Sequence, residues 1–242
     1  MIKAHYRKYL STQLQALHGK GSLEFELFRK YYHKNYSSFL PKSKKALILD
    51  IGFGMGHFLY FLKKSGYNNY IGIDLSQESV KYCIENNLGT NKNLLEADVS
   101  TYLKSTRSKF DVVVMNDVIE HIDKDRIVPT LISIKKSLSR NGKIIIKTVN
   151  AANPITGCSS RYFDITHTIC FTPESLSQVI RLAGFNKFVI LPQDIWVINP
   201  VINLLGKIAQ TIMNNIIRLM YLLYGRTTTR VFTKDMIAVI TK

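Results

Sequence analysis

Hydrophobic and polar positions along the middle of the chain follow two alternating patterns. Short continuous apolar runs, such as 112–114 and 144–146, are typical of strands buried on both faces. Between these runs, apolar residues recur at helical spacing. The predicted strands are 46–51, 70–74, 93–96, 110–116 and 143–149, and the predicted helices between them are 57–65, 77–86, 100–105 and 124–139. Strand and helix repeated in this way predict an α/β fold with a parallel sheet.

Both ends of the chain depart from this repetition. Residues 1–40 carry no strand pattern and predict two helices, 4–17 and 23–39. Near the other end, 188–191 and 236–240 predict a sixth and a seventh strand, with a long segment between them. We therefore divide the chain into an N-terminal helical cap (1–40), a core (41–191 and 236–242) and a helical insertion (192–235).

The insertion contains an amphipathic helix, predicted over 201–224. Its apolar face consists of Val201, Leu204, Leu205, Ile208, Ile212, Ile216, Leu219, Met220 and Leu223. A regular polar stripe on the other face argues against a helix that spans a bilayer. The apolar face could lie on a membrane, pair with a second subunit as a homodimer, or pack on its own domain. We rank a membrane or a lipid-linked substrate slightly above a homodimer, because the apolar face is flanked by the basic residues Lys207, Arg218, Arg226 and Arg230.

Composition narrows the class of partner and the compartment. The formal net charge of +16 favours an anionic partner, although scattered lysines also fit a lysine-rich background composition. A hydrophobic content of 46% indicates a globular chain. The first residues show no apolar signal core, and three cysteines without a CxxC pair fit reduced thiols rather than a structural zinc site. We expect a cytoplasmic location, with the inner face of the membrane as the alternative.

A glycine-rich stretch that could bind a ligand follows the first predicted strand directly. Gly52, Gly54 and Gly56 stand at alternate positions, where glycine permits positive φ and lets a ligand approach the backbone closely. Asp74 ends the next strand about 20 residues further on, a spacing at which a carboxylate accepts hydrogen bonds from ribose hydroxyls. His57 replaces the third glycine of a dinucleotide fingerprint, and no P-loop Lys-Ser/Thr pair follows. The pattern predicts an adenosine-type ligand.

These motifs resemble those of the class I S-adenosylmethionine-dependent methyltransferases. The matching stretches are 50–56 for the glycine loop, 72–76 for the ribose-binding strand end, 96–99 for the acidic turn that contacts adenine, 110–122 for the fourth-strand motif of the branch with the quinone-pathway O-methyltransferases, and 138–143 for the turn into the fifth strand. The resemblance covers about 41–185. It implies a doubly wound, Rossmann-like, mostly parallel seven-stranded sheet and S-adenosylmethionine as the cofactor.

The resemblance also implies roles for individual cofactor-binding residues. The glycine loop would hold the amino-acid part of the cofactor, Asp50 its ammonium, Asp74 the ribose and Asp98 the adenine amine. The full expected set is Asp50, Gly52, Gly54, Gly56, Asp74, Leu75, Asp98, Val99 and Asn116. A helix at 23–39 would lie over the cofactor, which makes Tyr32 a lid candidate, although core packing is the default for its aromatic stripe.

Asp117, Glu120 and His121 form the first candidate cluster on the acceptor side. A helical turn would place these residues, at i, i+3 and i+4, on one face beside the methyl group. His121 or Asp117 would then act as a general base, or the three would bind a divalent cation. A purely structural role is the alternative. We expect no metal, although a similar Glu-His pair in quinone-pathway enzymes has been linked to one.

A second cluster follows the fifth predicted strand. Thr172 and Pro173 predict a helix start, and a polar loop precedes them at the carboxyl edge of the sheet. The run from 161 to 176 resembles a segment of methyltransferases found with surface-polysaccharide biosynthesis. Arg161, Tyr162 and Asp164 are the expected substrate-binding residues. His167 is the first choice for the general base, ahead of His121, with a buried structural histidine as the alternative.

Together these features predict an S-adenosylmethionine-dependent O-methyltransferase. The expected acceptor is a sugar hydroxyl of an anionic or lipid-linked glycan in surface-polysaccharide biosynthesis, and the alternative is a quinone precursor or another lipid-like phenol. Nucleic acid is not expected, because 116–119 lacks the Asn/Asp-Pro-Pro-aromatic motif of base amino-group methylation. A catalytically silent scaffold is the alternative from a different class.

Overall fold

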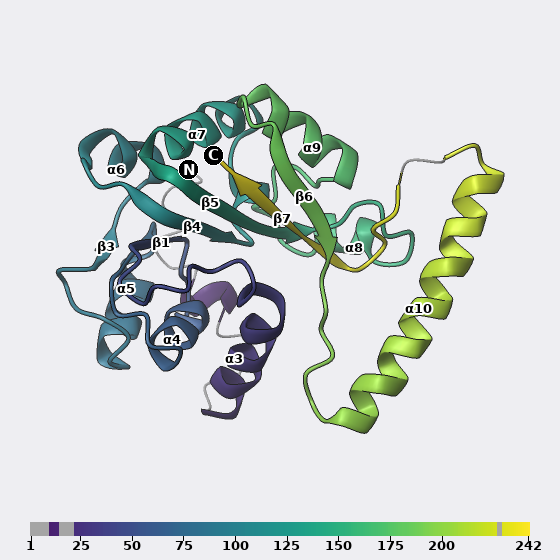
Figure 1. Ribbon diagram of the computed structural model, residues 1–242, viewed down its shortest axis with the longest axis horizontal. Helices are drawn as coiled ribbons and strands as arrows, with labels where there is room; N and C mark the ends of the chain where they lie inside the picture. The colour runs from purple at the N-terminus through teal and green to yellow at the C-terminus, as the bar shows by residue number, and fades with distance from the viewer. Residues whose placement is uncertain (1–9, 15–21, 227–228) are drawn as a thin grey trace.

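A single mixed sheet forms the centre of the computed structural model, which describes residues 10–14, 22–226 and 229–242 (Figure 1). Its strands are β1 (Ile48–Ile51), β2 (Tyr70–Asp74), β3 (Leu94–Glu96), β4 (Phe110–Asn116), β5 (Leu138–Val149), β6 (Lys187–Pro192) and β7 (Asp235–Thr241). They lie in the order β3-β2-β1-β4-β5-β7-β6. Only β7 runs antiparallel to its neighbours, β5 and β6. The predicted doubly wound, mostly parallel α/β sheet is confirmed.

The predicted helices are present in the predicted order on the two faces of this sheet, with α10 (Pro200–Leu223) beside it, and α8 (Gly157–Tyr162) is a short helix in the segment predicted as a polar loop (Figure 1). The other helices are α3 (Ser22–Tyr36), α4 (His57–Lys64), α5 (Gln77–Glu85), α6 (Val99–Ser105), α7 (Lys124–Ser137) and α9 (Pro173–Leu182), with a 3-10 turn η2 (Ile119–His121). Thr172 caps α9 in a reciprocal pair with Ser175, as the sequence predicts. Most of the predicted helix 4–17 lies outside the described residues, of which Leu10–Leu14 form a π-helical turn, η1.

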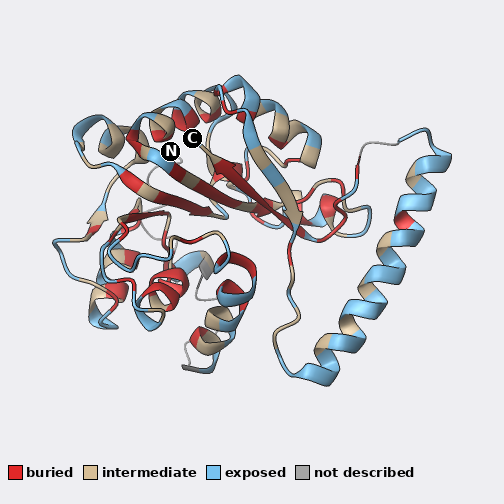
Figure 2. Cartoon of the chain, in the orientation of Figure 1, coloured by how far each residue is buried: buried red, intermediate tan, exposed pale blue. Residues whose placement is uncertain are grey.

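The strands of the sheet are largely buried (Figure 2). Two hydrophobic cores lie on opposite faces of the sheet, because successive strand residues point to alternate sides. Val113 and Ile144 belong to the core that α7 and α9 cover. Val112 and Ile145 belong to the other core, which also contains the aromatic side chains of α3 and α4. Both sets are fully buried. The sheet is therefore enclosed on both faces, so a ligand is expected at the ends of its strands.

Strand β5 begins earlier than the sequence predicts. The helix before it ends at Ser137, and Leu138 pairs with Phe110 of β4. Leu138 is buried, and the Ser139 hydroxyl donates to the Asp111 carboxylate at 2.9 Å. These contacts hold 138–142 against β4, with an irregularity in register between Phe110 and Val112.

Candidate functional site

The loop between β1 and α4 has the backbone conformation that only glycine adopts readily. Gly52, Gly54 and Gly56 have φ of 71°, 52° and 79°. A Cβ on Gly52 would lie 2.4 Å from Cγ2 of Val118, and one on Gly56 would lie 2.5 Å from Cδ1 of Leu88. Conformation and close approach therefore both require glycine in this loop, at the carboxyl end of a central strand where α/β sheets bind ligands.

Asp50 immediately precedes this loop and is buried. Among the described residues neither of its carboxylate oxygens has a hydrogen-bond partner. Burial raises the pKa of the Asp50 carboxyl well above its usual range, and the charge of Asp74 adds to the effect. A buried acid in this state is costly unless a ligand supplies donors. The ammonium group of an amino-acid moiety fits that requirement.

Asp74 and Asp98, the two other predicted cofactor acids, already hold backbone groups. The Asp74 carboxylate accepts from Gly54 N at 2.9 Å and from Ser76 N at 2.8 Å, which ties the end of β2 to the glycine loop. Asp98 is the N-cap of α6 and lies 3.3 Å from Nη2 of Arg126. Partial burial raises the pKa of Asp98, but hydrogen bonds, including that of Arg126, outweigh this and leave the pKa below its usual value. Contact of Asp98 with adenine stays a prediction, as does contact of the half-buried Leu75 and Val99 with the cofactor.

Helix α3 packs beside the loop, but its contact with the site comes from a residue that the sequence analysis did not single out. Tyr32 is buried, with its ring centroid 5.1 Å from that of Phe58, in agreement with the default of core packing. Tyr36, one turn further on, donates its hydroxyl to Oδ1 of Asn116 at 2.5 Å. Tyr36 follows Tyr32 at helical spacing in the sequence, and that was the available signal.

Asp117 does not share a helical face with Glu120 and His121, so that expectation is wrong. Its φ of 53° turns the chain before η2 begins. Its carboxylate binds Nζ of Lys147 on β5, which also lies 3.9 Å from the Asp235 carboxylate. Burial lowers the pKa of Lys147, but these two acids outweigh it and leave the pKa well above its usual value. Lys147 was missed, although a lysine within an apolar strand was visible in the sequence.

The structure instead brings His167 to Glu120 and His121. One potential ligand atom from each residue lies within 4.8 Å of the others, and the two imidazole centroids are 4.7 Å apart. The turn after β4 and the loop after β5 meet because those strands are neighbours. Thr168 joins the two segments, since its N donates to the Glu120 carbonyl at 2.9 Å and its hydroxyl donates to the Ile122 carbonyl at 2.7 Å.

Hydrogen bonds orient both imidazoles in the same way. Nδ1 of His167 lies 3.0 Å from the Ser160 carbonyl, which can only accept, so this nitrogen carries a proton. Nδ1 of His121 lies 2.8 Å from Oγ1 of Thr166, whose own proton goes to Asp164 at 2.6 Å. Nδ1 of His121 is therefore also the donor. When the His167 ring is neutral, its Nε2 has the lone pair, the arrangement typical of histidines that bind a metal or accept a proton.

The electrostatics of Glu120, His121 and His167 favour a positively charged ligand. Burial raises the pKa of Glu120 to about 8, with the Asp117 charge adding to the effect, and among the described residues its carboxylate oxygens have no hydrogen-bond partner. Burial and then the neighbouring His167 lower the pKa of His121 to about 4, so it is neutral at pH 7. A carboxylate and two imidazoles form a donor set that suits a divalent cation.

The three expected substrate-binding residues have different surroundings. Tyr162 is exposed, and the guanidinium of Arg161 lies 5.4 Å from its ring centroid. Asp164 is buried and accepts from the backbone N and the hydroxyl of Thr166, which links it to His121, and its contact with a substrate stays a prediction. Its burial follows from the loop folding back onto η2.

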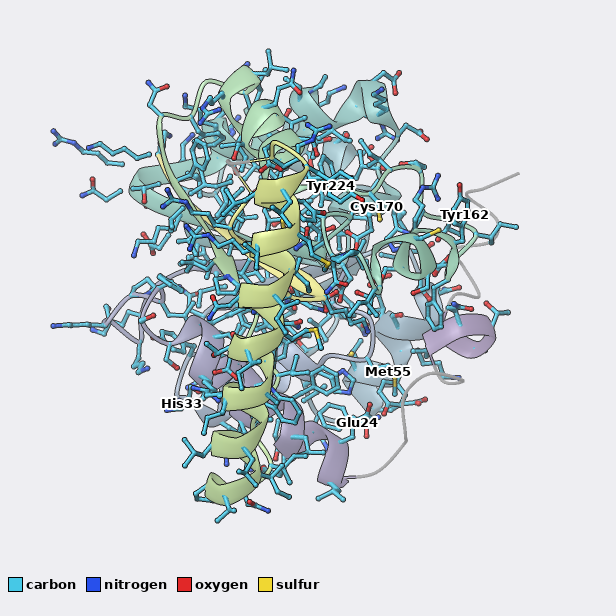
Figure 3. All side chains as sticks on the ribbon, turned by 90° about the vertical axis from the view of Figure 1, so that its right-hand side faces the viewer. Glu24, His33, Met55, Tyr162, Cys170 and Tyr224 are labelled. Carbon is cyan, nitrogen blue, oxygen red and sulfur yellow. The ribbon has the colours of Figure 1, made fainter. Side chains whose placement is uncertain are left out.

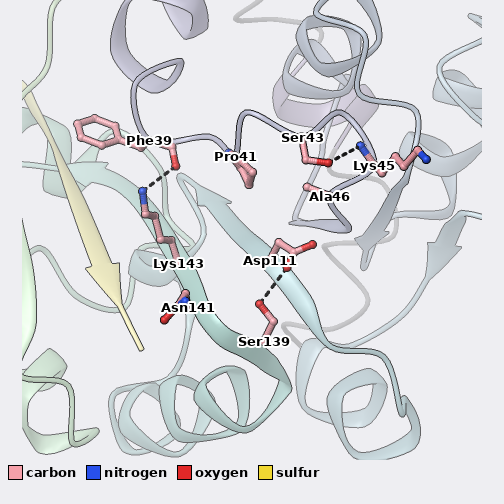
Figure 4. A pocket seen from close by; sticks show the side chains of 9 residues that line it. All are labelled: Phe39, Pro41, Ser43, Lys45, Ala46, Asp111, Ser139, Asn141 and Lys143. Atoms are coloured by element: carbon pink, nitrogen blue, oxygen red, sulfur yellow. Dashed lines mark hydrogen bonds between the residues drawn. The ribbon is translucent and has the colours of Figure 1, made fainter.

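A separate cavity of about 460 Å³ lies where the strands begin, at the edge opposite this group (Figure 4). Ser139 and Asp111 line it, together with Lys143, whose Nζ donates to the Phe39 carbonyl at 3.2 Å. The glycine loop, Asp50 and the two histidines all lie at the carboxyl edge. The candidate active site is therefore at that edge and not in this cavity.

Comparisons with known proteins match this chain to methyltransferases. A model described as "Methyltransferase domain" matches residues 22–188. Ribosomal protein L11 methyltransferase of Thermosipho melanesiensis is 29% identical over 135 residues, which are 55% of this chain and 45% of that protein. Phosphoethanolamine N-methyltransferase 1 of Zea mays is 28% identical over 151 residues, 59% of this chain and 28% of that protein. The chain thus spans less than half the length of these curated relatives.

Solved structures share the fold over nearly the whole chain. A SAM dependent methyltransferase from Archaeoglobus fulgidus superposes with a TM-score of 0.64 at 23% identity, covering 90% of this chain and 94% of that one. The plantazolicin methyltransferase BpumL in complex with SAH gives 0.63 at 18% identity, covering 100% and 95%.

Proposed function

Because the chain belongs to the methyltransferase domain family and its methyl donor is S-adenosylmethionine, we propose that it methylates a hydroxyl group held at Glu120, His121 and His167. The observation that carries the proposal is the meeting of two histidines, each held at Nδ1, with a buried carboxylate at the same sheet edge as the glycine loop. A hydroxyl has a pKa far above neutral, so methyl transfer to its oxygen needs a nearby group that accepts the proton.

The cofactor fits the glycine loop and the acids around it. When bound, it supplies a methyl group already activated on a sulfonium. The chain's own residues then have to hold and align it. Gly52 and Gly54 leave room for the amino-acid part, Asp50 offers an unpartnered carboxylate to its ammonium, and Asp74 lies at the strand end where ribose hydroxyls would reach it.

On the acceptor side, His167 is the proposed general base. Its ring lies close to Glu120 and His121, and a hydrogen bond from Nδ1 to the Ser160 carbonyl fixes the orientation of the ring. His121 is neutral at pH 7, and Thr166 with Asp164 fixes its tautomer. Asp117, a third candidate from the sequence, is bound to Lys147, and we assign it a positioning role through that ion pair.

A divalent cation bound by Glu120, His121 and His167 is a second candidate mechanism. The donor set fits it, because the buried carboxylate needs a positive partner and both imidazoles lie within reach of the same ion. Such a cation would supply positive charge beside an acceptor oxygen. Titration with Co²⁺, whose visible absorption reports its ligands, tests this without turnover. An unchanged spectrum in both the native chain and the His167→Ala variant would count against metal.

The proposed acceptor is a sugar hydroxyl of an anionic or lipid-linked glycan. Its support is the net charge of +16, the Arg161–Tyr162 pair beside the group, and the sequence resemblance described above. The exposed apolar face of α10 favours a second candidate, a quinone precursor or other lipid-like phenol. The names of the curated relatives add a protein and phosphoethanolamine as acceptors to be screened.

Methyl transfer from labelled S-adenosylmethionine to these acceptor classes is the direct test. We expect transfer to a hydroxyl acceptor, lowered about a hundredfold in His167→Ala, while S-adenosylhomocysteine still binds. His33→Ala, on an exposed histidine of α3, is the matched control and should retain activity. Transfer to an amine only, or full activity in His167→Ala, would refute the proposal.

A further inference from the structure

Helix α10 stands beside the rest of the domain and is exposed along most of its length (Figures 1 and 2). The burial of its residues shows that a polar edge faces the domain and that the apolar face points outward. The residues turned toward the protein are Asn203, Gly206, Gln210, Asn214, Ile217 and Tyr221, of which only Ile217 is fully buried. The outer face is Val201, Leu204, Leu205, Ile208, Ile212, Ile216, Leu219, Met220 and Leu223, all exposed. An amphipathic helix of a soluble domain normally buries its apolar face, so this orientation is inverted.

Specific contacts hold the helix in this orientation near both of its ends. Nε1 of Trp196 donates to Oε1 of Gln210 at 3.1 Å, and a Cβ on Gly206 would lie 2.5 Å from the same indole. Near the other end, the Tyr221 hydroxyl donates to the Ala152 carbonyl at 2.7 Å. The contacts involve the polar edge, so rolling the apolar face inward would break them.

These attachments also place α10 beside the candidate active site. Ala152 follows β5 directly, in the segment that leads to His167. At the other end, the loop before α10 is bound to α3, since Asn35 Nδ2 donates to the Asp194 carbonyl at 2.9 Å. Figure 3 looks at the molecule from this side, with α10 in front and Tyr224 at its end. One end of α10 therefore lies beside the segment that leads to His167, and the loop before its other end lies beside α3.

The charge around α10 distinguishes between possible partners. Residues 195–234 contain five lysines and arginines and no aspartate or glutamate. Arg218, Arg226 and Arg230 are exposed. Two copies of this helix packed face to face would bring like charges together, whereas an anionic membrane surface would attract them. None of the described helices is long and apolar enough to cross a bilayer.

We propose that the outer face of α10 lies in the interface of an anionic membrane, with Arg218, Arg226 and Arg230 at the level of the lipid headgroups. An inserted apolar face flanked by cations is the usual geometry of a helix that lies on a membrane. The proposal does not depend on the acceptor chemistry, although this placement would bring a lipid-linked acceptor to His167.

Flotation of the full chain with vesicles tests this surface. The vesicles are phosphatidylcholine alone and phosphatidylcholine mixed with phosphatidylglycerol. We expect binding to the anionic vesicles, lowered about tenfold or more in the triple variant Leu204→Asn, Ile212→Asn, Leu219→Asn. The matched control is Leu23→Asn, Ile132→Asn, Leu182→Asn, which alters exposed apolar residues outside α10 and should bind normally.

A second pair of variants tests the charge. Arg218→Gln, Arg226→Gln, Arg230→Gln should lower binding to anionic vesicles about tenfold, while Lys42→Gln, Lys92→Gln, Lys104→Gln should leave it near the native level. Titration with S-adenosylhomocysteine confirms in each case that the cofactor site is folded, and it keeps this test separate from that of the methyl transfer.

The proposal would be overturned if the native chain failed to bind anionic vesicles, or if the α10 triple variant bound them as well as the native chain does. If vesicle binding were absent and light scattering showed a native homodimer that the same variant converts to a monomer, the outer face would be assigned to a second copy of the chain.

Discussion

Replacing Glu120 by glutamine should stabilise the free protein, and increasingly so as the pH rises. The folded-state pKa of Glu120 lies at about 8, above its ordinary value of 4.5. Between these values the folded chain retains a proton that the unfolded chain has released. The free energy of unfolding therefore falls as the pH rises from about 4.5 to about 8. Protonation of Glu120 at lower pH removes the penalty.

The structure sets the size of this effect. A pKa raised from 4.5 to about 8 corresponds to a penalty of about 5 kcal/mol above pH 8, at about 1.4 kcal/mol for each tenfold change in proton affinity. In a chain of this length that corresponds to roughly 10–20 °C in Tm as an upper limit. Glutamine has the same shape and no charge, so the penalty should vanish in Glu120→Gln.

Thermal or urea unfolding of both proteins between pH 5.5 and 8.5 measures the difference. Its growth with pH is the decisive observation, because a packing effect would be constant across this range. Divalent cation should also raise the Tm of the native chain at high pH, and much less that of Glu120→Gln. A stability difference independent of pH would refute this account of the buried carboxyl.

Three further predictions address the cofactor site and its neighbours. Asp74→Ala should weaken S-adenosylhomocysteine binding more than tenfold in calorimetric titration, about 1.4 kcal/mol or more, whereas His167→Ala should change it less than twofold; equal losses would contradict the separate roles. Gly52→Ala should destabilise the fold by about 1–3 kcal/mol in urea unfolding, and Val118→Ala in the same chain should recover part of that loss; no recovery would exclude the steric cause. Tyr36→Phe should cost about 1 kcal/mol of stability, and an unchanged unfolding midpoint would show that its hydroxyl bond contributes nothing.

Local features of this protein were predictable from sequence because their causes are local. Apolar runs at 112–114 and 144–146 predicted the doubly buried strands, and Thr172 with Pro173 predicted the start of α9. Three glycines at alternate positions after an apolar strand predicted a loop with positive φ, and Gly52, Gly54 and Gly56 have that conformation. Periodicity and turn chemistry depend on neighbours within a few residues, and sequence contains those neighbours in order.

Side-chain orientation across the fold depended on tertiary structure. His167 reaches His121 only because β4 and β5 are adjacent, and Asp117 turns away because Lys147 stands on the next strand. The two faces of α10 were evident from sequence, but the face toward the domain was decided by Trp196 and the Ala152 carbonyl. Such contacts join residues far apart along the chain, and their free energy, unlike helical periodicity, exists only once the strands have paired.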